Sequence, residues 1–271
     1  MHSSSSSPFP SLPVESLGSG PDIVLLHGWG LHSEFFRPWL PHVLAHCRVH
    51  LIDLPGHGLS PPVAPFTLDT MAQAIAHRMA TIAPHYAVAG WSLGGAVALR
   101  LAIDFPERVS HVITLASAPR FLRADDWNHA TTSHALELLR GGLSRDYAGT
   151  LAQFFELNLA SRWPALSATL KHLATQRPAT HRVALDDGIA LTSGVDLRDE
   201  VTRIRAPLLA ISGRLDRLSY SQSSAWLADA TGGTHVELAH AAHAPHLSHG
   251  DEVAAHVLAH LARPHSAAIQ R

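Results

Sequence analysis

Gly90-Trp91-Ser92-Leu93-Gly94-Gly95 is the stretch that decides the fold of this 271-residue chain. It follows a short apolar run at 86–89 and precedes the apolar segment 96–102, which is predicted to be a helix. A serine with glycines at both second neighbours can occupy a sharp strand-to-helix turn with its hydroxyl exposed, because no side chain crowds the bend. Ser92 is therefore a candidate nucleophile, provided that the rest of the chain supplies its partners.

Apolar runs and helical periodicity alternate on both sides of this turn. Strands are predicted at 23–26, 49–54, 86–89, 111–116, 207–212 and 235–238, and the apolar runs at 23–26 and 49–54 are typical of strands buried on both faces. Helices are expected at about 33–44, with an interruption near Pro38 and Pro41, at 67–83 with Thr67 as N-cap, after Ser92, at 221–230 and at 251–261. This alternation predicts an α/β fold with a mostly parallel sheet covered by helices on both faces.

The alternation stops near residue 121 and resumes near residue 195. The intervening segment has no strong strand pattern, and helices are predicted at 135–139, 147–159 and 166–174, separated by Gly141-Gly142 and Pro164. We therefore expect a core formed by 21–120 and 195–263, into which a helical cap at 121–194 is inserted. A disordered serine-rich tail at 1–20 and a C-terminal tail at 264–271 complete the predicted organisation.

Composition excludes several classes of protein. The formal net charge is −2 at pH 7 and no basic stripe is present, which argues against nucleic acid or an anionic membrane as the main partner. No apolar run reaches the roughly 18 residues that a membrane span needs. The single cysteine, Cys47, cannot form an intrachain disulfide, and the N-terminus lacks the basic start and apolar centre of a signal peptide. A cytoplasmic protein is the simplest expectation.

Two later loops supply the partners that a nucleophilic serine needs. A base must remove the hydroxyl proton, and a third group must hold that base in the right tautomer. Asp216 follows the predicted strand at 207–212, and His243 follows the one at 235–238. Loops at the carboxyl ends of parallel strands meet at one edge of the sheet. The order Ser92, Asp216, His243 is also that of the α/β-hydrolases.

Other residues compete for these roles. The rival acids Asp187, Asp196 and Asp199 lie in or at the end of the insertion, away from a strand end. Histidines also recur every third residue at 240, 243, 246 and 249, which could suggest a metal cluster. Pro245 breaks a helix there, however, and no cysteine or carboxylate joins the histidines at ligand spacing. We therefore predict a general base at His243 and no metal site.

Acyl transfer also needs donors aimed at the oxyanion that develops on the substrate carbonyl. We predict that one donor is the backbone N–H of Leu93, at the start of the helix after Ser92. The second is expected from the loop after the first parallel strand, through the N–H of Trp29. His27 is interpreted as a structural residue of that loop. The indole rings of Trp29 and Trp91 could line an apolar pocket, although buried packing explains Trp91 nearly as well.

Together, several motifs resemble a known family. They are His27-Gly28-Trp29-Gly30, the run from Asp53 to Ser60, Gly90 to Gly95, Pro106 to Val109, Val195 to Arg198 and Ala241-Ala242-His243-Ala244-Pro245. The chain is similar in these motifs to the pimeloyl-ACP methyl ester carboxylesterases of biotin synthesis, within the α/β-hydrolase superfamily. The resemblance spans about 23–261 and is strong in the core.

The resemblance implies a serine carboxylesterase acting on a methyl ester of a medium-length acyl chain, with an acyl carrier protein as the partner that carries it. It places Trp29, Leu93, Phe154, Leu157 and Asn158 against the substrate. It implies no cofactor, and we expect a monomer. In the cap, Gln153 and Gly149 stand where the family has arginines, and the basic residues are spread differently.

Two other functions are compatible with the sequence. The same triad could cleave a carbon–carbon bond in a ring-fission diketone, which requires polar or basic pocket groups to hold a carboxylate. Alternatively, the fold could act as a ligand receptor whose triad turns over slowly or not at all.

Overall fold

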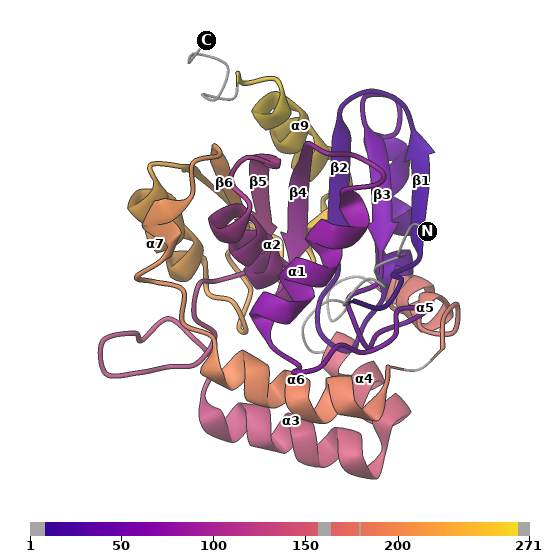
Figure 1. Ribbon diagram of the computed structural model, residues 1–271. Coiled ribbons are helices and arrows are strands. Elements are labelled where there is room, and N and C mark those ends of the chain that lie inside the picture. Colours follow the sequence, from indigo (N-terminus) through magenta and orange to yellow (C-terminus); the bar gives the residue numbers. More distant parts are fainter. Residues whose placement is uncertain (1–8, 157–163, 179, 265–271) are drawn as a thin grey trace.

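A seven-stranded sheet forms the centre of the molecule (Figure 1). The computed structural model describes residues 9–156, 164–178 and 180–264. The strands are β1 (Val14–Gly18), β2 (Asp22–Leu26), β3 (Arg48–Ile52), β4 (Tyr86–Trp91), β5 (Val109–Leu115), β6 (Leu208–Gly213) and β7 (Thr234–Leu238). Their order is β1-β3-β2-β4-β5-β6-β7, and every pair except β1–β3 is parallel. The predicted mostly parallel sheet is confirmed.

Strand β1 corrects the prediction that 1–20 is a disordered tail. Val14 pairs with Ile52 and Gly18 with Arg48, so β1 extends the sheet as an antiparallel edge strand. Its residues are half-buried or exposed, and the sequence Val-Glu-Ser-Leu-Gly contains no apolar run that would signal a buried strand. Backbone pairing with β3 holds this segment in a way that hydrophobic patterning does not report. The predicted tails at 1–8 and 265–271 lie outside the described residues.

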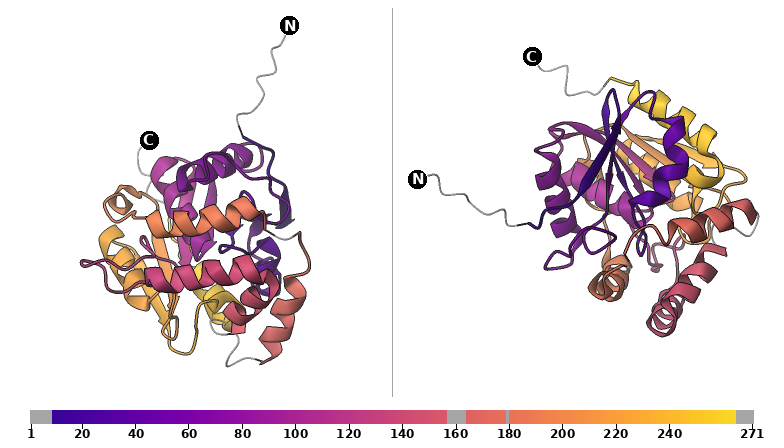
Figure 2. Two further views of the ribbon diagram at one scale, coloured as in Figure 1. Left: turned by 90° about the horizontal axis from the view of Figure 1, so that it is seen from below. Right: turned by 90° about the vertical axis from the view of Figure 1, so that its right-hand side faces the viewer.

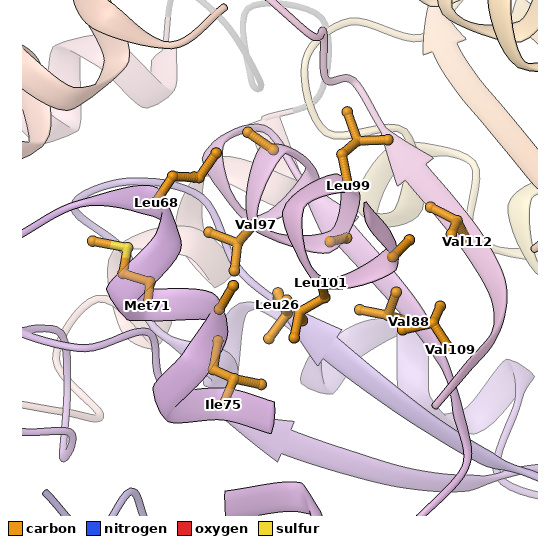
Figure 3. Close-up of a cluster of buried hydrophobic side chains, with 14 of the residues drawn as sticks. Leu26, Leu68, Met71, Ile75, Val88, Val97, Leu99, Leu101, Val109 and Val112 are labelled. Atoms are coloured by element: carbon orange, nitrogen blue, oxygen red, sulfur yellow. The ribbon is translucent and has the colours of Figure 1, made fainter. Parts of the chain in front are cut away.

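Helices cover both faces of the sheet, as predicted. Helices α1 (Leu68–Met79), α2 (Leu93–Asp104) and α7 (Ser221–Thr231) pack on one face, and η1 (Ser33–His42) and α9 (Gly250–Leu261) pack on the other. Strand β2 shows the alternation, because Val24 and Leu26 belong to the first buried cluster while Ile23 and Leu25 belong to the second. Figure 3 shows Leu26 within the first cluster, between the side chains of α1 and those of α2.

Local sequence explains the form of two helices. Pro38 and Pro41 lie inside η1, which is a 3₁₀ helix, because proline removes the N–H that an α-helix needs. Thr67 caps α1 as predicted: its Oγ1 accepts a hydrogen bond from the Thr70 N–H at 3.2 Å. Both helices therefore begin where the sequence pattern places them.

Within the described residues, four helices lie between β5 and β6 in sequence: α3 (Ser133–Arg145), α4 (Tyr147–Phe155), α5 (Pro164–Leu173) and α6 (Arg182–Gly194). Figure 1 shows α3, α4 and α6 below the sheet, past the ends of β4 and β5, and Figure 2 shows α3 and α6 side by side. A short 3₁₀ turn, η3 (Val201–Arg203), then leads back to the sheet. Helices α3, α4 and α6 therefore lie beyond the edge of the sheet at which β4 ends and Ser92 follows (Figure 1).

The structure differs from the sequence prediction at two of these helices. Helix α3 continues through Gly141-Gly142, where a break was expected; a Cβ at Gly142 would lie 2.8 Å from the Thr150 side chain, so the glycine allows α3 and α4 to approach closely. Helix α6 was not predicted, because its buried face consists of Ala184, Gly188 and Ile189, two of which are too small to mark an apolar stripe. No helix among the described residues has the length and hydropathy of a membrane span.

Candidate active site

Ser92 lies on the turn between β4 and α2 with φ 55° and ψ −120°, a conformation that non-glycine residues rarely adopt. The neighbouring glycines make this turn possible. A Cβ at Gly90 would lie 2.1 Å from the Gly94 carbonyl oxygen, and one at Gly94 would lie 2.2 Å from the Leu26 carbonyl oxygen. Any larger side chain would push α2 away from the sheet, so the spacing of glycine, serine and glycine is a steric requirement.

Hydrogen bonds hold the backbone of Ser92 in this unfavourable conformation. Its N–H donates to the carbonyl of Leu115 on β5 at 3.0 Å. Its carbonyl accepts from the Ser117 hydroxyl at 2.7 Å and from the Gly95 N–H at 2.9 Å. The strain at the turn is thus balanced by three contacts from two neighbouring elements, which fix the direction of the hydroxyl.

The three residues predicted to form a catalytic chain lie together. His243 Nε2 is 3.0 Å from Ser92 Oγ, and His243 Nδ1 is 2.8 Å from Asp216 Oδ2. Asp216 Oδ1 accepts the backbone N–H groups of Leu218 at 2.8 Å and Ser219 at 3.1 Å. Since Asp216 is only 4% exposed and His243 only 3%, water does not screen the contact between them. This arrangement fixes the imidazole with Nε2 facing the serine.

Trp91 positions the backbone of the His243 loop. Its indole Nε1–H donates to the His243 carbonyl at 2.6 Å, and its side chain is fully buried although it lines the cavity beside Ser92. The His246 ring packs edge-on against Trp91, with centroids 4.8 Å apart, and tilted against Phe36, with centroids 4.9 Å apart. Burial, and then the charge of His243, lower the pKa of His246 to about 3, so its ring is neutral. Trp91 and His246 therefore pack together beneath the loop that carries His243.

The structure separates the histidines of the repeat at 240, 243, 246 and 249. His243 contacts Ser92 and Asp216, His246 is enclosed by aromatic rings, and His240 is exposed. No three metal-ligating side chains come together within the part of the chain that the structure describes. The repeat of three residues therefore does not gather the imidazoles at one point.

The loop after β2 lies against Ser92, where an oxyanion would form. A Cβ at Gly28 would contact the Ser92 Cβ at 3.4 Å, so Trp29 follows directly beside the nucleophile. Leu93 is the first residue of α2, and its N–H is among the amides that find no acceptor within a helix. The two amides named in the sequence analysis thus come from segments that flank the serine hydroxyl.

His27 is structural, as predicted. Its Nε2 accepts the Leu54 N–H at 2.9 Å, so its Nδ1–H donates to the Gly28 carbonyl at 2.8 Å. Burial, followed by the nearby His57, lowers the pKa of His27 to about 3. The neutral ring joins the end of β2 to the loop after β3.

An apolar cavity opens beside Ser92. Its walls combine residues of the sheet region with residues of the segment 121–194: Gly28, Trp29, Leu31, Trp91, Leu93, Phe121, Thr131, Leu136, Leu139, Phe154, Ile189, Thr192, Leu218, Ser219 and His243. The Trp29 indole lies in this wall and donates from Nε1 to the Ala184 carbonyl of α6 at 2.9 Å. Among the described lining residues, His243 is the only one with an ionisable side chain. The cavity therefore suits an uncharged, aliphatic group.

Trp29, Leu93 and Phe154 were predicted to contact the substrate and Trp91 was considered as a pocket residue, and all four line this cavity; the other residues that 121–194 contributes were not predicted. Leu157 and Asn158 lie outside the described residues. The spacing of Leu136 and Leu139 on α3 marks an apolar helix face that the sequence pattern could have revealed. Thr192 lies on α6, which was not predicted. Of the rival acids, Asp187 and Asp199 are exposed and Asp196 pairs with Arg120 and Arg198, away from His243.

Comparison with known proteins gives a consistent picture. The model of the "Alpha/beta hydrolase family" matches residues 23–256. The chain is 36% identical to a pimeloyl-[acyl-carrier protein] methyl ester esterase of Nitrosomonas europaea, over 88% of this chain and 94% of the relative. It is 38% identical to the protein of the same name from Stenotrophomonas maltophilia, over 89% of this chain and 93% of that relative.

Solved structures agree in fold. An esterase from Exiguobacterium antarcticum superposes with a TM-score of 0.84 at 21% identity, covering 93% of this chain and 96% of its own. An enol-lactonase from Burkholderia xenovorans gives a TM-score of 0.80 at 23% identity, with the same coverage. At these identities the likeness concerns the fold alone.

Proposed function

The chain belongs to the alpha/beta hydrolase family, and on that premise we propose that it is a serine carboxylesterase in which Ser92, His243 and Asp216 carry the reaction. The observation that carries the proposal is the hydrogen-bonded chain from Asp216 through His243 to Ser92, beside an apolar cavity. A buried carboxylate on Nδ1 leaves Nε2 free to accept the hydroxyl proton.

In the first half of the reaction, Ser92 Oγ attacks the ester carbonyl while His243 Nε2 takes its proton. The carbonyl oxygen becomes an oxyanion, which the N–H groups of Trp29 and Leu93 stabilise as it forms. Asp216 stabilises the imidazolium and does not itself take a proton. His243 then donates the proton to the leaving alkoxide, so the alcohol departs and the acyl group remains on Ser92.

In the second half, water enters the place of the alcohol. His243 removes one of its protons, the hydroxide attacks the acyl-enzyme carbonyl, and the same two amides hold the second oxyanion. The proton returns through His243 to Ser92 Oγ, and the acid is released. The steps require no metal ion or organic cofactor.

For the substrate, we propose a methyl ester of a medium-length acyl chain borne by an acyl carrier protein, which is the substrate printed in the names of the relatives. The aliphatic side chains Leu31, Leu136, Leu139 and Ile189 support an uncharged chain in the cavity. The proposal assigns residues 121–194 to a cap over the core. It also assigns the protein to the cytoplasm as a monomer, in keeping with its lone, buried Cys47.

The same lining argues against cleavage of a carbon–carbon bond in a ring-fission diketone. Such a substrate carries a carboxylate, and burying it calls for a cationic partner. Within the described wall, the side chains with polar atoms are Trp29, Trp91, Ser92, Thr131, Thr192, Ser219 and His243, with no arginine or lysine. An ester with an aliphatic acyl chain is the better match.

The test is the Ser92→Ala variant. We expect it to lose turnover of a short p-nitrophenyl ester and labelling by a fluorophosphonate, because the attacking oxygen is gone. A thermal melt matched to the parent protein shows that the variant is folded. Undiminished turnover by folded Ser92→Ala protein refutes the assignment. The proposed substrate is tested separately, by complementing a biotin-requiring strain that lacks its own methyl esterase.

A further inference from the structure

The cavity beside Ser92 contains two hydroxyl groups that the proposed reaction does not use. Among the polar side chains of its described wall, Ser92 and His243 carry the reaction. Three others already donate to backbone carbonyls: Trp29 to Ala184 at 2.9 Å, Trp91 to His243 at 2.6 Å and Thr192 to Gly188 at 2.7 Å. The hydroxyls of Thr131 and Ser219 remain, and neither makes a hydrogen bond with the residues that the structure describes.

Both of these hydroxyls lie inside the molecule and keep accessible surface. Ser219 is 2% exposed and Thr131 is 9% exposed, and both residues line the cavity. Neither oxygen is sealed within the protein without a partner, as the hydroxyl oxygen of Thr114 is. An interior hydroxyl without a partner is costly, so it takes a hydrogen bond from whatever molecule reaches it. The molecule that reaches these two is the one that occupies the cavity.

The two hydroxyls come from segments that are in contact with each other. Ser219 lies between Asp216 and α7, and its N–H donates to Asp216 Oδ1 at 3.1 Å. Thr131 ends the loop that precedes α3. Two residues before Thr131, the carbonyl of His129 accepts a hydrogen bond from the hydroxyl of Ser223, in the first turn of α7. Thr131 and Ser219 therefore belong to one region of the cavity wall, beside the start of α7.

This pair of hydroxyls suits a neutral oxygen acceptor on an aliphatic chain. A carbonyl oxygen has two lone pairs and can accept from both hydroxyls. A carboxylate would need a cation to offset its burial, and the described wall has no arginine or lysine. The carbonyl that Ser92 attacks is not the acceptor, because its oxygen is assigned to two backbone amides. Ser219 also lies beyond Asp216, the member of the hydrogen-bonded chain that is furthest from Ser92.

The substrate proposed above supplies such an acceptor. An acyl chain that is a methyl ester at one end and is joined to a carrier at the other end bears a carbonyl at each end. We propose that Ser219 and Thr131 form a polar subsite that donates hydrogen bonds to the second carbonyl of the acyl chain. The proposal rests on the esterase function and identifies the residues that distinguish this chain from a simple aliphatic ester, which the apolar walls accept equally well.

Two esters that differ in one oxygen test the proposal. Methyl 7-oxooctanoate has a ketone at the position of the second carbonyl of a pimeloyl chain, and methyl octanoate has a methylene group there. The measurement is kcat/KM for methanol release from each ester, and the selectivity is the value for the oxo ester divided by the value for the plain ester. Contacts that the two esters share cancel in this ratio.

Ser219→Ala and Thr131→Val remove the hydroxyls with little change in shape. Each should lower the selectivity about fivefold, the effect of losing one hydrogen bond between neutral groups. Thr192→Val is the matched control. It removes a hydroxyl from the same wall, but one that is already bonded to the Gly188 carbonyl, so the selectivity should stay at the value of the parent protein. Thermal melts establish that each variant is folded.

The possible outcomes separate this proposal from the esterase function. If either Ser219→Ala or Thr131→Val leaves the selectivity within twofold of the parent value, or if Thr192→Val lowers it equally, the subsite is refuted while the esterase function stands. If the parent protein hydrolyses neither ester, the esterase function fails and the subsite fails with it.

Discussion

Replacing Asp216 by asparagine should disable His243 while leaving the loop intact. Asp216 Oδ1 accepts two backbone N–H groups, from Leu218 and Ser219, so the amide oxygen of an asparagine takes that place. The amide nitrogen then faces His243 Nδ1, where Asp216 Oδ2 now lies at 2.8 Å. Because that nitrogen can only donate, Nδ1 must accept, and the ring proton moves to Nε2. His243 then presents a proton to Ser92 and cannot remove one.

The opposite rotamer of the amide does not rescue the site. It would set an NH₂ group against the N–H groups of Leu218 and Ser219, leaving two buried donors unsatisfied at about 1–3 kcal/mol each. The productive tautomer is therefore disfavoured by several kcal/mol. We expect kcat to fall about 10⁴-fold, equivalent to about 5 kcal/mol in the activation free energy, with little change in KM.

The assay is steady-state hydrolysis of a p-nitrophenyl ester, with the ¹⁵N chemical shifts of the His243 ring as a direct report of the tautomer. Asp196→Asn is the matched control, because Asp196 is a rival acid that pairs with Arg120 and Arg198, and its kcat should equal that of the parent. The reasoning is refuted if folded Asp216→Asn protein keeps its kcat within tenfold, or if Asp196→Asn is the variant that loses it.

Two further predictions concern the packing that supports the site. Burial lowers the pKa of His246 from its ordinary 6.5 to about 3. Below pH 6.5 the unfolded chain therefore binds a proton at His246 that the folded chain excludes. This difference lowers the free energy of unfolding by about 1.4 kcal/mol for each pH unit below 6.5. Between pH 7 and pH 5, the free energy of unfolding measured by urea denaturation should fall less for His246→Phe than for the parent protein. An equal fall in the two proteins contradicts the prediction. Gly94→Ala should prevent soluble expression or cost several kcal/mol, because its Cβ would lie 2.2 Å from the Leu26 carbonyl oxygen and 2.6 Å from that of His27. Gly232→Ala is its control: φ is 65° but nothing lies within 4 Å, so thermal melts should show a loss of about 1–2 kcal/mol, and equal losses in the two variants contradict the steric argument.

The sequence predicted those parts of the fold whose burial is recorded in side-chain type. Strand β2, with Ile23 to Leu26, is buried on both faces and reads as an unbroken apolar run. Strand β1 is stabilised by pairing with β3 at the sheet edge, and helix α6 is packed through small residues such as Gly188, so neither leaves an apolar pattern. Prediction therefore failed where backbone pairing or close approach, instead of side-chain hydrophobicity, holds an element.

In the candidate site, too, some residues could be predicted from the sequence and others could not. Ser92, Asp216 and His243 could be placed because each follows a strand, and parallel strands end at a common edge. The part of the cavity formed by residues 121–194 could not be placed, because the position of α3 depends on its packing against α4 and α6, and the sequence does not specify those crossing angles. Leu136 and Thr192 line the same cavity although 56 positions separate them in the chain.

Trp29 joins these two parts of the molecule. Its backbone N–H is assigned to the oxyanion, and its indole Nε1–H donates to the Ala184 carbonyl of α6 at 2.9 Å. A Cβ at Gly188 would lie 2.1 Å from that nitrogen, so α6 can approach the indole only because residue 188 is a glycine. A shift of α6 must therefore move the indole or break its hydrogen bond. The helical insertion therefore contacts the candidate site in two ways, by forming part of the cavity wall and by holding the side chain of Trp29, whose N–H is proposed as an oxyanion donor.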